Sequence, residues 1–145
     1  MIGLIQRVAG ASVTVGNKTV GQIDKGILLL LGIEKEDGSN EVEKLARKVM
    51  NYRIFADEQG KMNLSLLDVG AKLLVVSQFT LVAQTDKGNR PGFSLGASPE
   101  HGERIYNQFV QHVREQYGHC ETGIFGADMQ VALVNDGPVT FQFKV

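Results

Sequence analysis

The chain has 145 residues, of which 43% are hydrophobic and 21% are charged, and its formal net charge is -1. This is about the length of one domain with a core of its own, and we expect a single domain over residues 1–145. The near-neutral charge argues against a global basic surface for nucleic acid, but it does not exclude a local patch. Cys120 is the only cysteine, so no disulfide can form within the chain.

The apolar runs of the chain favour a cytoplasmic protein that does not enter a membrane. Residues 1–10 lack the long apolar run of a signal peptide. The longest apolar stretch, Ile27–Ile33, is far shorter than the roughly 20 residues that cross a bilayer. A single cysteine also favours a reducing compartment.

The first half of the sequence predicts four strands, two of them joined as a hairpin, and then a helix. Ile2–Val8 is expected to form a strand, and two alternating runs around Gly16-Asn17 are expected to form a hairpin. Ile27–Ile33 is typical of a strand that is buried on both faces. Asn40 and Glu43 then predict a capping box at the start of a helix. Its apolar stripe has helical spacing: Val42, Leu45, Ala46, Val49 and Met50.

The second half predicts further strands and a second helix. Residues 53–55 and 62–66 are expected to form either short strands or irregular structure, and Lys72–Leu81 is the clearest strand of the chain. Ser98-Pro99 predicts the start of a helix, since serine is a preferred N-cap and proline a preferred first residue. The apolar stripe of this helix is Ile105, Tyr106, Phe109, Val110 and Val113.

The chain ends in two strand-like segments, 129–134 and 139–145, which we expect to pair as a hairpin through Asp136-Gly137-Pro138. With about seven strands and two main amphipathic helices, the predicted fold is mixed α/β, with largely antiparallel sheets or a barrel-like core. Each helix then needs one sheet face to cover its apolar stripe.

Two familiar kinds of site are excluded by their context. Gly92–Gly96 has the spacing of a nucleophile elbow around Ser94, but a polar loop with Pro91 precedes it where that motif requires a strand. His101 and His112 share a helical face, yet 11 residues place them about 16 Å apart, too far to bind one metal ion. We therefore expect no metal site.

Two other stretches remain as candidate sites. If Lys72–Leu81 is a strand, alternation places Gln78 and Thr80 on one face and Ser77 on the other. The alternative is a strand that simply leaves the core and meets water. At Gly137-Pro138, the proline either stiffens a turn or forms a cis peptide bond, and the residues alone leave both open.

These two stretches also carry a resemblance to a known family. The segments "SQFTL" (77–81) and "NDGPVT" (135–140) resemble the two signature motifs of the D-aminoacyl-tRNA deacylases. The opening "QRV…ASVTV" and the segments "KGNRP" and "GADMQVALVNDGPVTF" are similar too, and the resemblance covers essentially the full length. One departure is Gly92, which stands where the family has serine.

The resemblance implies a three-layer β/β/α fold, a symmetric homodimer, and hydrolysis of the ester between a D-amino acid and the 3′ adenosine of tRNA. It implies a cis Gly137-Pro138 bond in a loop that enters the partner's active site and recognises the amino group of the substrate. No metal, organic cofactor, DNA or membrane is implied. The implied site residues are catalytic Ser77, Gln78, Phe79 and Thr80, chiral-selecting Gly137 and Pro138, and adenine-binding Phe125 and Met129.

For the chemistry we expect a water nucleophile, assisted by the ribose 2′-hydroxyl of tRNA, with Thr80 in a supporting role. A threonine nucleophile requires an activating base, and the motif itself holds none. The alternative function is a non-catalytic module that binds tRNA 3′ ends. It would share contacts from Lys87 and Arg90 but release no amino acid.

Overall fold

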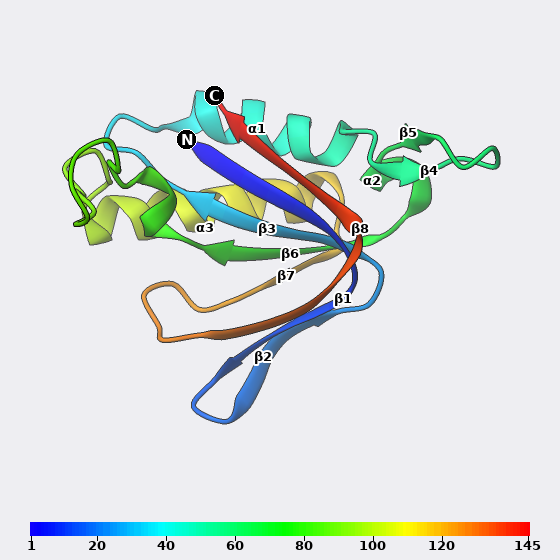
Figure 1. Cartoon of the computed structure of the whole chain (residues 1–145), viewed down its shortest axis with the longest axis horizontal. Coiled ribbons are helices and arrows are strands. Elements are labelled where there is room, and N and C mark those ends of the chain that lie inside the picture. Colours follow the sequence, from blue (N-terminus) through cyan, green and yellow to red (C-terminus); the bar gives the residue numbers. More distant parts are fainter.

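The computed structural model describes residues 1–145, and one long bent strand, β1 (Ile2–Val15), organises them (Figure 1). It turns through Gly16 and Asn17 into β2 (Lys18–Ile23). Both turn residues have positive φ, 53° and 68°, as the favoured two-residue hairpin turn requires. The predicted hairpin is confirmed, although the separate first strand that we predicted continues into it without a break.

The sheet has the strand order β2-β1-β3-β6-β7, and β8 pairs with the other edge of β1. β3 (Gly26–Gly32) is antiparallel to β1 and parallel to β6 (Lys72–Ser77). β6 is in turn parallel to β7 (Cys120–Thr122). Helical connections after β3 and β6 make these two parallel pairs possible, whereas the rest of the sheet is antiparallel.

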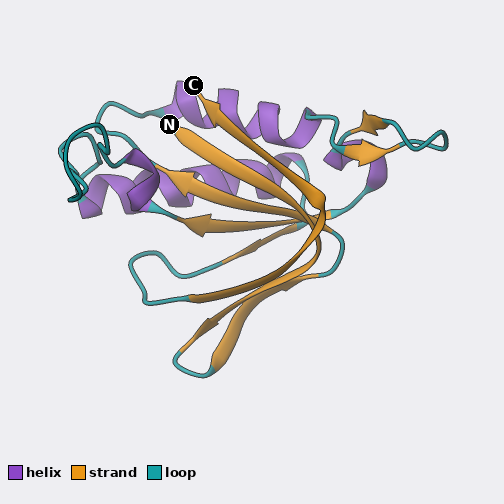
Figure 2. Ribbon diagram, viewed as in Figure 1, coloured by secondary structure: helices purple, strands orange, loops and turns teal.

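Two amphipathic helices, α1 (Ser39–Asn51) and α3 (Pro99–Gln116), cover one face of the sheet (Figure 2). Both predicted apolar stripes are buried. The predicted capping box of α1 is wrong by two residues, because Gly38 is the N-cap and its N–H donates to Glu41 Oε2 over 3.0 Å. The predicted Ser98 cap of α3 is confirmed, since its hydroxyl accepts from the His101 N–H.

Three short elements, β4, β5 and α2, lie together at one end of the molecule (Figure 1). β4 (Phe55–Ala56) and β5 (Met62–Leu64) form a small antiparallel pair, so of the two alternatives for 53–55 and 62–66 the short strands are present, with different bounds. α2 (Leu66–Val69) follows them, with Ser65 as its N-cap. None of the helices of the chain combines the length and hydropathy that a membrane span requires.

β3 and β6 are buried on both faces, which explains their continuous apolar sequences. Alternate residues of these strands pack either against the helices or against the curled half of the sheet formed by β1, β2 and β8. A side chain on Gly21 of β2 would collide with the Thr122 backbone of β7, so the curled sheet almost closes on itself. The fold is therefore the three-layer β/β/α arrangement with a barrel-like core that we expected.

The last predicted hairpin is wrong, because β8 (Gln130–Lys144) is one strand that pairs with β1 along nearly its whole length. The register shifts between Gln6 and Val8 and again between Val8 and Gly10. These shifts accommodate Asp136, Gly137 and Pro138 as a bulge. A proline is tolerated in the bulge because no backbone hydrogen bond between β8 and β1 requires an N–H at this position.

Candidate functional site

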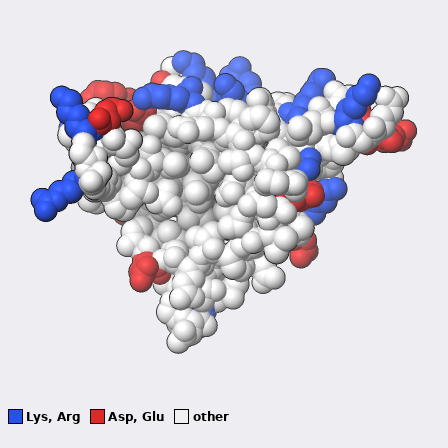
Figure 3. All heavy atoms as spheres, viewed as in Figure 1, with Lys and Arg blue, Asp and Glu red and all other residues white.

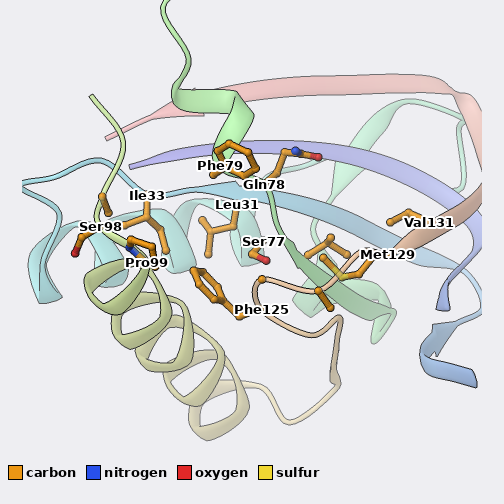
Figure 4. Close-up of a pocket in the computed structure, with 15 residues that line it drawn as sticks. Leu31, Ile33, Ser77, Gln78, Phe79, Ser98, Pro99, Phe125, Met129 and Val131 are labelled. Atoms are coloured by element: carbon orange, nitrogen blue, oxygen red, sulfur yellow. The ribbon is translucent and has the colours of Figure 1, made fainter. Parts of the chain in front are cut away.

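A cavity of about 490 Å³ opens where β6 ends (Figure 4). Its walls come from four parts of the chain: the end of β3, the end of β6 with the turn that follows it, the N-terminal end of α3, and the segment that leads from β7 into the start of β8. The lining is mostly apolar, with a few polar groups at one side, as is usual for small-molecule sites. Its residues include Leu31, Ser77, Gln78, Phe79, Ser98, Pro99, Gly102, Phe125, Met129 and Val131.

The polar side of the cavity is a turn that we had predicted as strand. β6 ends at Ser77, and Gln78 (φ -142°, ψ 83°) leads into a 3₁₀ helix, η1 (Phe79–Val82). The Gln78 N–H still donates to Leu31 O of β3 over 2.8 Å, but the Leu81 N–H donates back to Gln78 O over 3.2 Å. The alternation of faces therefore stops at Ser77.

This turn exposes several hydrogen-bond donors beside the cavity. The first N–H groups of a 3₁₀ turn, here those of Phe79 and Thr80, have no acceptor within the turn. Gln78 Nε2 donates to Thr80 Oγ1 over 2.6 Å. No histidine, lysine or carboxylate hydrogen-bonds to Thr80, so no base stands ready to activate its hydroxyl.

Phe125 and Met129, the expected adenine-binding residues, line the same cavity, with the Phe125 ring facing it in Figure 4. Two glycines leave room for them. A Cβ on Gly102 of α3 would lie 3.2 Å from Phe125 Cζ, and one on Gly123 would lie 2.6 Å from Met129 Sδ. The predicted residues Ser77, Gln78 and Phe79 thus share one cavity with this pair, and Thr80 adjoins it.

The contribution of α3 to the cavity was missed at the sequence level. Ser98 and Pro99 were assigned only to the start of the helix, but both line the cavity together with Gly102. A signal was present, because a glycine inside a helix costs about 1 kcal/mol relative to alanine and often marks a close contact.

Gly137 and Pro138 do not belong to this cavity within one chain. β8 starts at Gln130 beside the cavity, and Gly137 lies seven residues further along the strand, which is about 20 Å. The Gly137-Pro138 peptide bond is cis, and both residues are exposed. The two motifs of the resemblance therefore lie at different places on the surface of one chain.

Arg7, which the sequence did not assign to the site, binds the bulge of β8 at Asp136. Arg7 Nε donates to Asp136 O over 2.9 Å and lies 3.3 Å from Asp136 Oδ2. Its guanidinium also donates to Ile54 O. Arg7 belongs to the "QRV" segment that contributed to the resemblance, so this segment could have indicated a role for Arg7 at the site.

Two titratable groups with shifted pKa values lie near β6 but outside the cavity lining. Burial raises the pKa of Tyr106, whose hydroxyl donates to Val75 O over 2.9 Å. Burial also raises the pKa of Cys120 to about 11, although the Arg114 charge opposes this. Both groups stay neutral at physiological pH. They support β6 and β7 and are not part of the site chemistry.

Comparisons with known proteins show the family of the chain. The model of the D-Tyr-tRNA(Tyr) deacylase family matches residues 4–144. The D-aminoacyl-tRNA deacylases of Alteromonas mediterranea and Shewanella frigidimarina are 65% and 61% identical to this chain, each over 100% of both chains.

Two solved structures also match. One, named c-Myc DNA Unwinding Element Binding Protein, is 44% identical, with a TM-score of 0.95 over 100% of this chain and 99% of that one. The other is described as a probable eukaryotic D-amino acid tRNA deacylase and shares the fold, with a TM-score of 0.84 at 17% identity over 99% of this chain and 98% of that one. From the full-length match of the family and of close relatives, we conclude that the chain belongs to the D-Tyr-tRNA(Tyr) deacylase family.

Proposed function

We propose that this protein hydrolyses the ester of D-aminoacyl-tRNA, and of glycyl-tRNA, and spares L-aminoacyl-tRNA. The observation that carries the proposal is that Gln78 and Phe79 line the same cavity as Phe125 and Met129. An apolar wall suits a terminal adenine, and the donors of the turn suit an ester carbonyl. The names of relatives that are more than 60% identical point to the same substrate.

In the proposed reaction, a water molecule attacks the ester carbonyl carbon and gives a proton to the ribose 2′-hydroxyl, which passes its own proton to the ester oxygen of the ribose. Negative charge develops on the carbonyl oxygen, where the N–H groups of Phe79 and Thr80 would stabilise it. One such donor typically contributes about 2.7–4 kcal/mol. The bond between the carbonyl carbon and the ribose oxygen then breaks, and that oxygen takes up the proton. No metal or organic cofactor enters this scheme.

Chiral selection is assigned to Gly137 and Pro138 of a partner subunit. Within one chain these residues lie about 20 Å along β8 from the cavity, so they could act only on a second copy. A two-fold homodimer would let each subunit complete its partner's site. The face of β1 and β8 in Figure 3 carries few charged side chains, which suits such a contact.

The filter would work by steric exclusion. If the amino group and the ester are both held, a D side chain points into open space and an L side chain meets the loop. Glycine has no side chain to collide, so glycyl-tRNA would pass the filter. This arrangement discriminates by rejecting the wrong substrate and needs no pocket for a particular side chain.

The alternative is a non-catalytic module that binds tRNA 3′ ends in the same cavity. Incubation with D-tyrosyl-tRNA distinguishes the two functions, because only an enzyme releases many molecules of tyrosine per subunit. We expect multiple turnovers with D-tyrosyl-tRNA and none with L-tyrosyl-tRNA. Tight binding without release would establish the alternative. We also propose that the protein acts in the cytoplasm, as the proposed substrate suggests.

A further inference from the structure

Two phenylalanines are exposed together at the mouth of the cavity. The side chains of Phe79 and Phe93 are 66% and 44% exposed, and their ring centroids lie 5.2 Å apart at an interplanar angle of 50°. Phe79 also lines the cavity itself, as Figure 4 shows. An exposed pair of aromatic rings that continues the wall of a site is a candidate surface for a flat ligand.

The rings are presented by a structured loop. Gln84 and Gly92 exchange both backbone hydrogen bonds, at 2.8 and 3.0 Å, and Ser94 Oγ donates to Gln84 Oε1. Gly96 forms a second bridge to Glu34. Phe93 therefore lies between two positions, Gly92 and Gly96, at which the backbone is fixed by bridges to other parts of the chain. A Cβ on Gly92 would make only ordinary contact, 3.6 Å from Gln84, so glycine is not required for this bridge.

Two cations lie on the same loop, at its exposed tip. Lys87 and Arg90 are exposed, and neither forms an ion pair. Asp86 is the single acidic residue between Gln84 and Leu95, so the loop has a net positive charge. Exposed aromatic rings beside unpaired cations form the combination that binds single-stranded nucleic acid, because bases stack and phosphates are attracted.

We propose that Phe79 and Phe93 form a subsite for the nucleotide that precedes the terminal adenosine of tRNA. Its base stacks on the exposed rings, and its phosphates lie within the field of Lys87 and Arg90. This inference rests on the proposed function. It extends the recognised substrate from an aminoacyl-adenosine to at least a dinucleotide.

A second copy of the chain is the competing occupant of these rings, but the charges favour RNA. A contact between two copies would bring Lys87 and Arg90 toward equally positive loops if the loops met across a two-fold axis. RNA instead supplies phosphates at every step along the strand. Stacking also tolerates any base, so the subsite needs no hydrogen bonds to base edges.

The test compares two substrates that differ by one nucleotide, D-tyrosyl-adenosine and D-tyrosyl-cytidylyl-adenosine. The wild type should cleave the dinucleotide ester with the higher kcat/KM. Loss of one stacked base costs about 1–3 kcal/mol, so Phe93→Ala should lower kcat/KM for the dinucleotide ester about 5- to 150-fold. The same variant should leave the adenosine ester nearly unchanged. Phe93→Tyr, which keeps the ring, is the matched control and should behave like the wild type.

The remaining outcomes separate the subsite from the proposed function. If the wild type cleaves both esters equally well, the subsite is wrong and the deacylase function stands. If it cleaves neither ester nor D-tyrosyl-tRNA, the proposed function itself is wrong. Equal loss on both esters in Phe93→Ala means that the residue only supports the cavity. A shift of Phe93→Ala to a lower oligomeric state in sedimentation means that the rings form a protein interface.

Discussion

Gln78 and Thr80 hydrogen-bond to each other across one intervening residue, with 2.6 Å between Nε2 and Oγ1. The partner of the threonine hydroxyl is thus an amide, which cannot accept a proton as a general base does. Both side chains belong to the turn at η1, in which the Phe79 and Thr80 N–H groups have no backbone acceptor. The arrangement is suited to stabilising charge on a substrate oxygen and not to making threonine a nucleophile.

We therefore predict that Thr80→Ala retains deacylase activity. A single neutral hydrogen bond is worth about 0.5–1.5 kcal/mol, so kcat should fall by no more than about tenfold. Steady-state release of D-tyrosine from D-tyrosyl-tRNA measures this, with Thr80→Ser as the control that keeps the hydroxyl. A covalent acyl-enzyme trapped on Thr80 would contradict the prediction.

A second prediction concerns the close contact between Gly102 and Phe125. Alanine at an exposed helix position would stabilise α3 by about 1 kcal/mol. At Gly102, however, the new Cβ would lie 3.2 Å from the ring, and valine would push the ring further. We expect Gly102→Val to raise KM about fivefold or more, since overpacking typically costs about 1–3 kcal/mol. The change in kcat should be smaller.

The control for the effect of Gly102→Val on KM makes the side chain at position 125 smaller, which relieves its contact with position 102. In the double variant Gly102→Val with Phe125→Leu, the two substitutions should not be additive, because they act on one contact. Phe125→Leu alone gives the reference KM. Full additivity in this cycle would show that Gly102 acts through the helix and not through the ring.

The elements that were predicted correctly are those whose signals are local. The stripe of α1, the cap of α3 at Ser98, and the turn at Gly16-Asn17 each depend on residues within a few positions of one another. The buried strand at Ile27–Ile33 was also recognisable, because both of its faces are apolar.

The failures depend on pairing partners far away in the chain. β8 is one strand because β1 is long enough to pair with both of its halves, and nothing near Pro138 reveals this. β6 ends at Ser77 because the hydrogen bonds of Gln78 are divided between Leu31 and the turn. For the site, the motif residues followed from the resemblance. The distance of about 20 Å along β8 between the cavity and Gly137 follows from the fold alone.

A third prediction is a pH dependence of stability that arises at Glu34. Burial by itself raises the pKa of Glu34, but hydrogen bonds from Lys144 and the Met1 ammonium, with their charges, outweigh it and lower the pKa below its usual 4.5. A carboxyl whose pKa is lowered on folding stabilises the protein above its unfolded pKa. This contribution disappears as pH falls through the lowered value.

Urea unfolding of wild type and Glu34→Gln between pH 7 and pH 3 measures this effect. The difference in free energy of unfolding should be largest above about pH 5 and should shrink on acidification. The exposed neighbour Glu36, substituted in Glu36→Gln, is the control and should show no such trend. A difference that grows toward low pH would reverse the sign and refute the assignment.

The last prediction tests whether the loop of one subunit serves the cavity of the other. One variant, Gln78→Ala with Phe125→Ala, removes two side chains that line the cavity and so inactivates it. A second variant loses the loop through Gly137→Val, because a Cβ there would lie 2.7 Å from Val139 Cγ2 and 2.9 Å from Val139 N. Each variant alone should be nearly inactive, and sedimentation and circular dichroism should show that both still fold and associate.

Mixing the two variants in equal amounts, under conditions that exchange subunits, should restore activity. In a mixed dimer, one site combines the intact cavity of one chain with the intact loop of the other, and the second site has neither. Half of the dimers are then mixed and each carries one working site of two, so about a quarter of the wild-type activity should return. A loop that served the cavity of its own chain would leave every site in the mixture damaged, because each chain carries one lesion. Absence of recovery in verified mixed dimers would therefore defeat the cross-subunit site, whereas hydrolysis of D-tyrosyl-tRNA by the wild type would still support the enzyme.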